Sequence, residues 1–340
     1  MKKVLHLTMS NAHGGAETVI FSIIDNLNGQ YDFKYLCPEG KIEDILREKN
    51  IEYKTFKSFK EIKKKIEEIN PDVIHAHDFT ASVISGLFSG NRKIISHLHT
   101  SHRWIKGLNI KSLLYYLISF RFEKIVFVSK SMAKDMYFYN RLNKKAAILV
   151  NPIDKEKILN LSNAYCVRET YQLGFLGRLS HYKDPLKFID IVKEVKQKNP
   201  NIKAVIVGDG ELKESCKIKV KKLGLYENID FKGFLKNPFP VVKNINILVM
   251  PSKLEALGLS AIEAMALSKP VIASDIGGLS DFINEKNGVL CNDFQEFVKG
   301  IEKLLNNRKE YSEIANNAAK TAITLSNTDK YMWEIDRLYK

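Results

Sequence analysis

Residues 251–274 read PSKLEALGLSAIEAMALSKPVIAS and predict a loop, a helix and a strand in succession. The apolar strand expected at 245–250 ends just before this stretch, so Glu255 falls in a strand-to-helix loop. Gly258 lets the backbone approach a ligand closely. The helix expected from Leu259 points free N–H groups at the same place, which makes its N-terminus suited to an anion.

Two glutamates occupy this loop and helix. Glu263 lies about one turn into the helix, within reach of a ligand bound above the N-terminus. A carboxylate there can accept hydrogen bonds from a ribose diol, while Glu255 can hold sugar hydroxyls. On an ordinary helix both would be solvated surface charges. Here the neighbouring residues are small and apolar, which indicates burial, and buried carboxylates need partners: Ala256, Ala261, Ala264, Met265 and Ala266.

Strands and helices alternate along both halves of the chain. Helices such as those expected at 130–139 and 185–198 separate the strands, which implies parallel pairing and doubly wound sheets with ligands at the carboxyl ends of the strands. A loop-like break near 151–170 divides the two patterns. We therefore expect an α/β protein with two Rossmann-like doubly wound parallel-sheet domains facing a cleft. The expected strands are 4–8, 33–37, 73–77, 93–97, 124–128 and 147–150, then 173–176, 203–207, 229–231, 245–250 and 270–274.

Length and composition agree with this organisation. The 340 residues suffice for two domains, 1–155 and 156–325, followed by an amphipathic helix in 326–340 that crosses back to the first. Apolar residues make up 45% and charged residues 27%, which is typical of globular proteins. The sequence contains no apolar run of about 18 residues, so no membrane span is expected. The short apolar run near the N-terminus predicts a strand rather than a signal peptide. The four cysteines are far apart and favour reduced thiols in a cytoplasmic protein.

The net charge of +14 lies mostly in the first half of the chain. Residues 1–150 carry 24 Lys and Arg against 15 Asp and Glu, a net charge of +9. Basic surfaces suit nucleic acid, anionic membranes or phosphorylated small molecules, and charge alone does not choose among them. Compositional drift in a Lys- and Ile-rich chain explains the excess equally well.

The 251–274 stretch resembles the E-x7-E signature of retaining GT-B glycosyltransferases of the large family 4 type. In that family the first glutamate contacts the donor sugar and the second binds the nucleotide ribose, so the resemblance gives these roles to Glu255 and Glu263. Leu257 stands where an aromatic residue is common, and Ser268 stands where glycine is common. Neither difference removes a polar contact.

Further matches follow in the order of that family. Residues 174–185, GFLGRLSHYKDP, resemble its glycine-arginine-lysine loop, which implies that Arg178 and Lys183 bind the pyrophosphate and stabilise the charge of the leaving group. Residues 207–212 resemble its next strand end, and Gly277-Gly278 its later glycine pair. The resemblance assigns nucleotide-sugar contacts to Gly14, Gly15, Gly177, Gly208, Gly210, Leu257, Gly258, Leu259 and Glu263.

Five histidines cluster in the first half: His75, His77, His97, His99 and His102. A cluster suggests zinc, but no HExxH motif or cysteine partner is present, so no metal site is expected. The family places a histidine near the donor sugar and the acceptor, and His99 is the preferred candidate, with His97 and His102 as rivals. The sequence contains no Asp-x-Asp motif, so the metal-bound pyrophosphate of the GT-A fold is not expected.

The segment 102–121 mixes basic residues with Trp104, Tyr115 and Tyr116, a composition that suits a membrane interface. A core helix with charged ends explains it as well. On the membrane interpretation the protein is peripheral on the inner face of the cell membrane, and the acceptor is a lipid-linked glycan.

Together these features predict a metal-independent, hexosyltransferase-like enzyme that retains the anomeric configuration. It would move a sugar from a nucleotide diphosphate sugar to a hydroxyl of a lipid-linked or surface-polysaccharide acceptor, with no cofactor and no nucleic-acid partner. The predicted catalytic residues are His99, Arg178, Lys183 and Glu255. A GT-B-like sugar-nucleotide epimerase and a non-catalytic sugar-nucleotide or lipid-binding relative are the alternatives.

Overall fold

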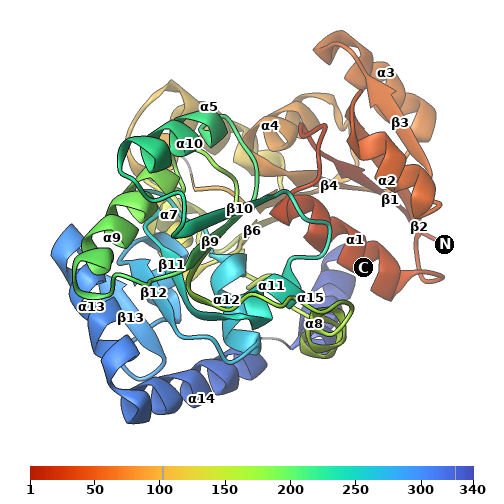
Figure 1. The fold of residues 1–340 in the computed structure, drawn as a ribbon. Coiled ribbons are helices and arrows are strands. Elements are labelled where there is room, and N and C mark those ends of the chain that lie inside the picture. The colour runs from red at the N-terminus through yellow and green to blue at the C-terminus, as the bar shows by residue number, and fades with distance from the viewer. Residues whose placement is uncertain (102, 326) are drawn as a thin grey trace. The chain divides into compact units, whose positions relative to one another are not determined.

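A computed structural model describes residues 1–101, 103–325 and 327–340. The chain forms two compact units, one of Met1–Pro152 with Thr328–Lys340 and one of Ile153–Asn327 (Figure 1). No helix of the described residues combines the length and the apolar character needed to cross a membrane.

The first unit is built on a seven-stranded sheet in which every pairing is parallel, in the order β3-β2-β1-β4-β5-β6-β7. The strands are β1 (Lys3–Leu7), β2 (Asp32–Pro38), β3 (Tyr53–Phe56), β4 (Val73–His77), β5 (Lys93–Leu98), β6 (Lys124–Phe127) and β7 (Ala146–Ile148). The helices are α1 (Gly15–Leu27), α2 (Ile42–Glu48), α3 (Phe59–Ile69), α4 (Asp78–Phe88), α5 (Ile110–Ile118), α6 (Lys130–Asp135), α7 (Tyr139–Leu142) and α15 (Thr328–Tyr339), with short 3₁₀ turns η1 (Arg103–Lys106) and η2 (Ser119–Arg121).

Helix α15 joins the core of the first unit although it comes last in the sequence. It contacts α1, and its apolar face carries Tyr331, Met332, Ile335 and Tyr339, all buried. The chain ends lie side by side, because Lys2 Nζ donates to the carbonyl oxygen of Lys340 at 2.7 Å (Figure 1). This unit is therefore completed by two distant parts of the sequence.

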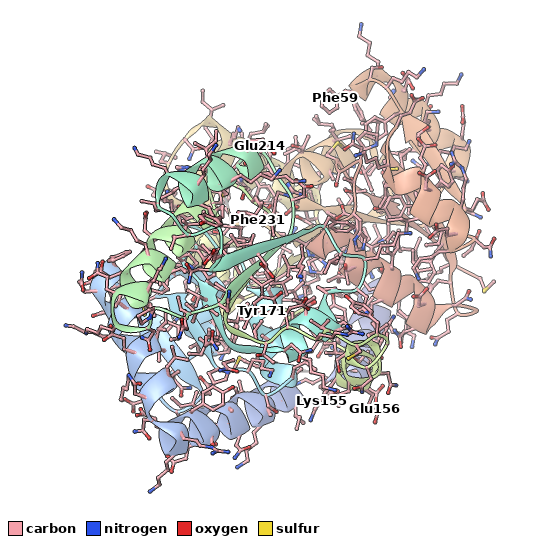
Figure 2. All side chains as sticks on the ribbon, in the orientation of Figure 1. Phe59, Lys155, Glu156, Tyr171, Glu214 and Phe231 are labelled. Carbon is pink, nitrogen blue, oxygen red and sulfur yellow. The ribbon has the colours of Figure 1, made fainter. Side chains whose placement is uncertain are left out.

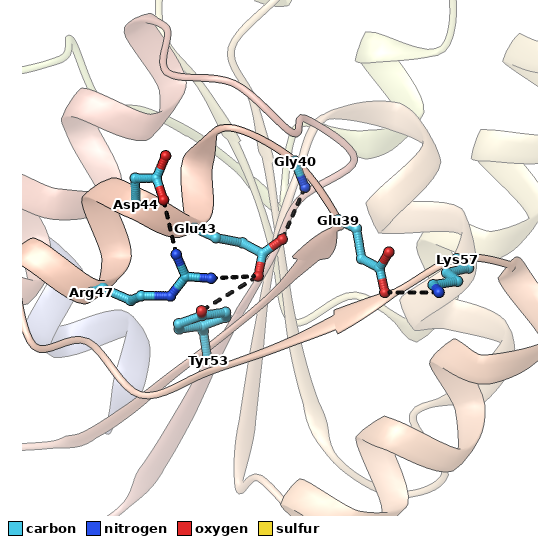
Figure 3. Close-up of polar contacts among 7 residues, drawn as sticks. All are labelled: Glu39, Gly40, Glu43, Asp44, Arg47, Tyr53 and Lys57. Carbon is cyan, nitrogen blue, oxygen red and sulfur yellow. Dashed lines mark hydrogen bonds and ion pairs between the residues drawn. The ribbon is translucent and has the colours of Figure 1, made fainter.

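A polar cluster fixes the start of α2 at the edge of the same sheet (Figure 3). The Glu43 carboxylate accepts hydrogen bonds from the Gly40 amide at 3.1 Å and from Arg47 at 3.3 Å. Tyr53 Oη on β3 donates to the same carboxylate at 3.4 Å, so the helix is tied to the edge strand. Placing a carboxylate in the first turn also complements the helix dipole.

The second unit repeats the plan with six parallel strands in the order β10-β9-β8-β11-β12-β13. Figure 2 places Tyr171 on β8 and Phe231 on β10, and Tyr171 Oη donates to the Asp230 carboxylate at 2.7 Å. The strands are β8 (Tyr171–Leu176), β9 (Ala204–Val207), β10 (Ile229–Gly233), β11 (Ile245–Met250), β12 (Val271–Ser274) and β13 (Gly288–Cys291). The helices are α8 (Lys155–Ser162), α9 (Pro185–Lys198), α10 (Lys213–Lys222), α11 (Phe239–Lys243), α12 (Leu259–Ala266), α13 (Phe294–Asn306) and α14 (Arg308–Leu325), with the 3₁₀ turn η3 (Gly277–Asp281).

Both units confirm the expected fold class, and two local expectations were wrong. The region 151–170 is not a plain break, because α8 forms there with Asp154 as its N-cap. The single helix expected at 130–139 ends at Asp135, where the backbone of Met136 turns extended with φ −70° and ψ 117°.

In each sheet the strand order reverses beside the first strand, between β1 and β4 in one unit and between β8 and β11 in the other. Ligands of open α/β sheets bind outside the carboxyl ends of the strands at such a reversal. The topology therefore directs attention to the loops that follow these four strands.

Candidate active site

The reversal point of the second sheet is flanked by the loops that follow β8 and β11. The loop after β11 leads through Gly258 into α12, and Gly258 adopts a left-handed φ of +93°. A Cβ on Gly258 would lie 2.5 Å from Leu279 Cδ2, so a side chain is excluded both by the backbone and by packing. Helix α12 therefore begins at Leu259, as the sequence predicted, and its first N–H groups are free of partners within the helix.

The two loops are joined by an ion pair at this point. Lys183 Nζ, after β8, donates to Glu255 Oε1, after β11, and the glutamate side chain is almost fully buried, at 5% exposed. Ser252 Oγ donates to the same oxygen at 3.0 Å. The structure thus brings Lys183 and Glu255 together and adds Ser252, which the sequence reasoning missed.

Glu263 lies on α12 within the electrostatic influence of Lys183. Desolvation raises the pKa of its carboxyl group to about 7, and the positive charge of Lys183 partly offsets this rise. No cation of the described residues pairs with Glu263 directly. A half-buried carboxyl group in this state can exchange hydrogen bonds with hydroxyl groups of a ligand.

The glycines after β8 and β9 allow two loops to pack against each other. A Cβ on Gly208 would lie 1.9 Å from the carbonyl oxygen of Gly177, and one on Gly210 would lie 2.5 Å from that of Leu179. A Cβ on Gly177 would make an ordinary van der Waals contact with the Lys183 side chain at 4.0 Å. Gly208 and Gly210 are thus explained by backbone packing, whereas Gly177 is explained by its φ of +154°, which favours glycine.

The Gly277-Gly278 pair supports the Glu255 loop from η3. A Cβ on Gly277 would lie 2.0 Å from the Glu255 carbonyl oxygen, and the Gly278 amide donates to that oxygen at 3.3 Å. Leu257 is buried in the protein interior at 4% exposed, so its side chain helps to hold the loop. The pair therefore fixes the backbone on which Glu255 stands.

The reversal point of the first sheet carries a second group of polar residues. Gly14 precedes α1, whose first turn holds the buried Glu17, and burial raises the pKa of that carboxyl group. After β4, Asp78 adopts a φ of +68° and accepts hydrogen bonds from the amides of His99 at 2.8 Å and Thr100 at 3.0 Å. Asp78 thus ties the loop after β5 to the start of α4.

Five buried histidines lie on β1, β4 and β5 or directly after them: His6, His75, His77, His97 and His99. The sequence reasoning missed His6. His77 lies 3.0 Å from His6 and 2.9 Å from His99, measured between ring nitrogens. A second series of hydrogen bonds runs through His75. Its Nε2 lies 3.1 Å from His97 Nδ1, and its Nδ1 lies 2.7 Å from Tyr339 Oη on α15. His6 pairs with His75 between the parallel strands β1 and β4. Aligning the two predicted strands side by side could therefore have revealed it.

Burial lowers the pKa of every histidine in this network, and that of His99 falls to about 4 despite the nearby Asp78 carboxylate. The rings are therefore neutral near pH 7. Among the described residues, two trios bring one ring nitrogen from each histidine within 4.8 Å, and His77 belongs to both. An ion placed between His77 Nδ1 and His99 Nε2 would have to replace an existing hydrogen bond, and no carboxylate belongs to either trio. We assign no ion to them.

The predicted site residues thus fall into two groups. Lys183, Glu255, Gly258 and Glu263 belong to one site in the second unit, where Arg178 is exposed at the end of β8 and makes no ion pair with any described residue. Gly14, Gly15 and His99 belong to the first unit. His99 retains 8% exposure while His97 has none, and His102 lies outside the described residues.

Comparisons with known proteins agree with this description. The model of the family Glycosyltransferase Family 4 matches residues 13–157, and the model of the family Glycosyl transferases group 1 matches residues 167–321. An uncharacterized glycosyltransferase of Methanocaldococcus jannaschii is 29% identical over 66% of this chain and 60% of its own length. The GalNAc-alpha-(1->4)-GalNAc-alpha-(1->3)-diNAcBac-PP-undecaprenol alpha-1,4-N-acetyl-D-galactosaminyltransferase of Campylobacter jejuni is 26% identical over 94% of this chain and 93% of its own length.

The structure of Anabaena HepE in complex with UDP and glucose superimposes with a TM-score of 0.86, at 20% identity and with 99% of each chain covered. Two parallel-sheet α/β units with this likeness show the GT-B fold. The two family matches, one to each half of the chain, together with this fold identify the chain as a GT-B glycosyltransferase of the group 1 type.

Proposed function

We propose that the protein transfers a sugar from a nucleotide diphosphate sugar to an acceptor hydroxyl with retention of the anomeric configuration, without a metal ion or a cofactor. The observation that carries the proposal is the Lys183–Glu255 pair beside the N-terminus of α12. An ammonium group and a helix N-terminus suit the diphosphate. A buried carboxylate beside them suits the hydroxyls of the sugar.

The pair suggests how donor binding would reorganise the site. Without donor, Lys183 and Glu255 neutralise each other, and Ser252 supplies a further hydrogen bond to the carboxylate. Diphosphate oxygens would engage Lys183, and sugar hydroxyls would take its place on Glu255. Each partner would thus exchange one hydrogen bond for another, so that neither charge is left unpaired on burial.

In the transfer step the bond between the anomeric carbon and the diphosphate oxygen breaks, and its electron pair leaves with the diphosphate. The acceptor oxygen bonds to the anomeric carbon on the same face, and the proton of its hydroxyl group passes to the departing diphosphate. Lys183 and the N–H groups of α12 would stabilise the charge that develops on the leaving group. Glu263 would accept hydrogen bonds from the ribose.

Two further assignments belong to the proposal. Arg178 is free to turn toward the diphosphate, because it is exposed and makes no ion pair with any described residue. His99 would contact the donor sugar or the acceptor, because it keeps some exposure and one ring nitrogen, Nδ1, without a hydrogen-bond partner among the described residues.

We further propose a lipid-linked or surface-polysaccharide glycan as the acceptor and peripheral contact with an anionic membrane. The full-length similarity to the Campylobacter jejuni enzyme, whose name includes a PP-undecaprenol glycan, supports a lipid-linked acceptor. The similarity to the O-antigen biosynthesis glycosyltransferase WclY of Escherichia coli, at 26% identity over 81% of this chain, supports a surface polysaccharide.

The test begins with a thermal-shift screen of UDP-, GDP- and ADP-sugars, in which one donor should raise the unfolding temperature. With that donor, Glu255→Gln should lower transfer by roughly 100-fold or more, because a group that is hydrogen-bonded in the transition state is lost. Glu214→Gln is the matched control on the exposed surface of α10 (Figure 2) and should leave transfer unchanged.

The products then separate the alternatives. Transfer to added acceptor supports the proposal, and the anomeric configuration of the product tests retention. Release of nucleotide with an altered free sugar and no acceptor product would favour an epimerase. Full activity of Glu255→Gln would overturn the assignment of the site.

A further inference from the structure

Helix α5 turns its large apolar side chains outward. The exposed apolar residues in and beside this helix form what we call the α5 surface, and their exposed fractions run from 39% at Leu114 to 87% at Ile110. Four of them are spaced three or four residues apart along α5, so they share one face of the helix. An ordinary surface helix buries such a face. The α5 surface consists of Leu108, Ile110, Leu113, Leu114, Leu117 and Phe120.

The inner face of α5 is held by specific contacts. Tyr115 is buried, and its Oη lies 2.5 Å from Ser96 Oγ, which in turn lies 2.7 Å from Ser82 Oγ. Gly86 on α4 allows a close approach, because a Cβ there would lie 2.2 Å from Ile118 Cγ2. Asn109 and Ser112 form a capping box at the start of the helix. These contacts fix the rotation of α5 and therefore keep its apolar face exposed.

The segment of the chain that carries this apolar surface is strongly basic. Residues 103–145 contain ten Lys and Arg but only two Asp and Glu, a net charge of +8 out of +14 for the chain. Lys145 Nζ donates to the carbonyl oxygens of Phe120 at 3.0 Å and Phe122 at 2.7 Å, which places it at the carboxyl end of α5. Arg121 lies at the same end, and Lys111 is exposed on α5 itself.

This charge selects among the possible occupants of the surface. A second copy of the chain would bring one segment of charge +8 against another, which opposes association through this face. An apolar face bordered by Lys and Arg matches a bilayer with anionic headgroups, because the side chains can enter the interface while the cations meet the phosphates. The charge therefore favours a membrane over a like-charged partner.

We propose that the α5 surface is the docking site of this protein on an anionic lipid bilayer, with Leu113, Leu114 and Leu117 entering the interface and the exposed Lys111 and Arg121 contacting headgroups. The proposal adds a membrane-binding surface to the proposed function. It rests on that function in one respect only, namely that the enzyme would encounter its lipid-linked acceptor at the bilayer. Vesicle binding is measured without donor or acceptor, so its result is independent of the transfer assay.

The experiment is flotation of the full chain with vesicles of phosphatidylcholine, alone or with about one third phosphatidylglycerol. The wild type should float with the anionic vesicles, less with the neutral ones, and less at high salt because the charges are screened. The double substitution Leu113→Glu with Leu117→Glu should lower binding at least tenfold. Its matched control is Ile218→Glu with Ile323→Glu, which alters two exposed apolar residues outside the α5 surface and should leave binding unchanged.

Three results would overturn the proposal. One is equal flotation of the Leu113/Leu117 variant and the wild type, with unchanged circular dichroism in both. Another is equal binding of the wild type to neutral and anionic vesicles, or to neither. The third is an oligomer of the wild type in sedimentation that the Leu113/Leu117 variant loses, because the surface would then belong to a second copy.

Discussion

The substitution Glu263→Gln tests the electrostatics of the candidate site without any substrate. Burial raises the pKa of the Glu263 carboxyl group to about 7 from an ordinary value of 4.5. Between these two values the folded state holds a proton that the unfolded state has released, so stability falls as the pH rises through this window. Glutamine cannot titrate, and the variant escapes this loss.

The size of the effect follows from the width of the window. Each pH unit of pKa shift corresponds to about 1.4 kcal/mol, so the 2.5 units between 4.5 and 7 amount to about 3 kcal/mol. The difference in unfolding free energy between Glu263→Gln and the wild type should grow by about 1.4 kcal/mol per pH unit up to pH 7. Above pH 7 it should stay constant. Between pH 5.5 and 7.5 the expected gain is about 2 kcal/mol.

Urea unfolding followed by far-UV circular dichroism measures this difference at each pH. Both tryptophans, Trp104 and Trp333, lie in the first unit, so their fluorescence identifies its transition and leaves the other to the second unit. Glu214→Gln, on an exposed glutamate of α10, should show a difference that does not change with pH. A flat profile for Glu263→Gln as well would refute the reasoning that burial protonates this carboxyl group.

Three further predictions concern the rest of the fold. Acidification below pH 6.5 should destabilise the first unit by about 1.4 kcal/mol per pH unit for each histidine kept neutral by burial. Tryptophan fluorescence should report this loss, and an unfolding free energy that does not change from pH 6.5 to 5 would contradict it. Tyr339→Phe should cost about 1–3 kcal/mol in urea unfolding, because it leaves His75 Nδ1 buried without its partner, and an unchanged midpoint would show that the hydrogen bond is dispensable. Gly208→Ala should destabilise the second unit by more than about 2 kcal/mol through its clash with Gly177, whereas Gly107→Ala, in open space, should stay within about 0.5 kcal/mol; similar unfolding midpoints for the two would argue against the packing.

The alternation of apolar runs predicted most of the sheet because both faces of a parallel strand are buried. The ranges expected for β4, β11 and α9 agree with the structure at both ends. The strands β3 and β13 were missed, since each is four residues long and only partly buried. Their formation depends on pairing with β2 and β12, and such tertiary support is invisible in a local pattern.

The candidate site was partly predictable for a different reason. Glu255 and Lys183 were found through a motif, but their direct bond depends on the adjacency of β8 and β11, which the strand order creates. Ser268 had been noted as a departure from glycine, and its φ of +59° explains the usual glycine, because few residues adopt this conformation. Tyr339 could not have been assigned to the histidines from sequence, since 264 residues separate it from His75.

The return of α15 to the first unit has a consequence for the order in which the protein matures on the ribosome. Translation adds about 5–20 residues each second, and the whole second unit, Ile153–Asn327, is made before α15. The second unit is continuous and can therefore fold while synthesis proceeds. The first unit waits roughly 10–35 seconds at these rates, with the side of its core that Tyr331, Ile335 and Tyr339 will cover still open to chaperones.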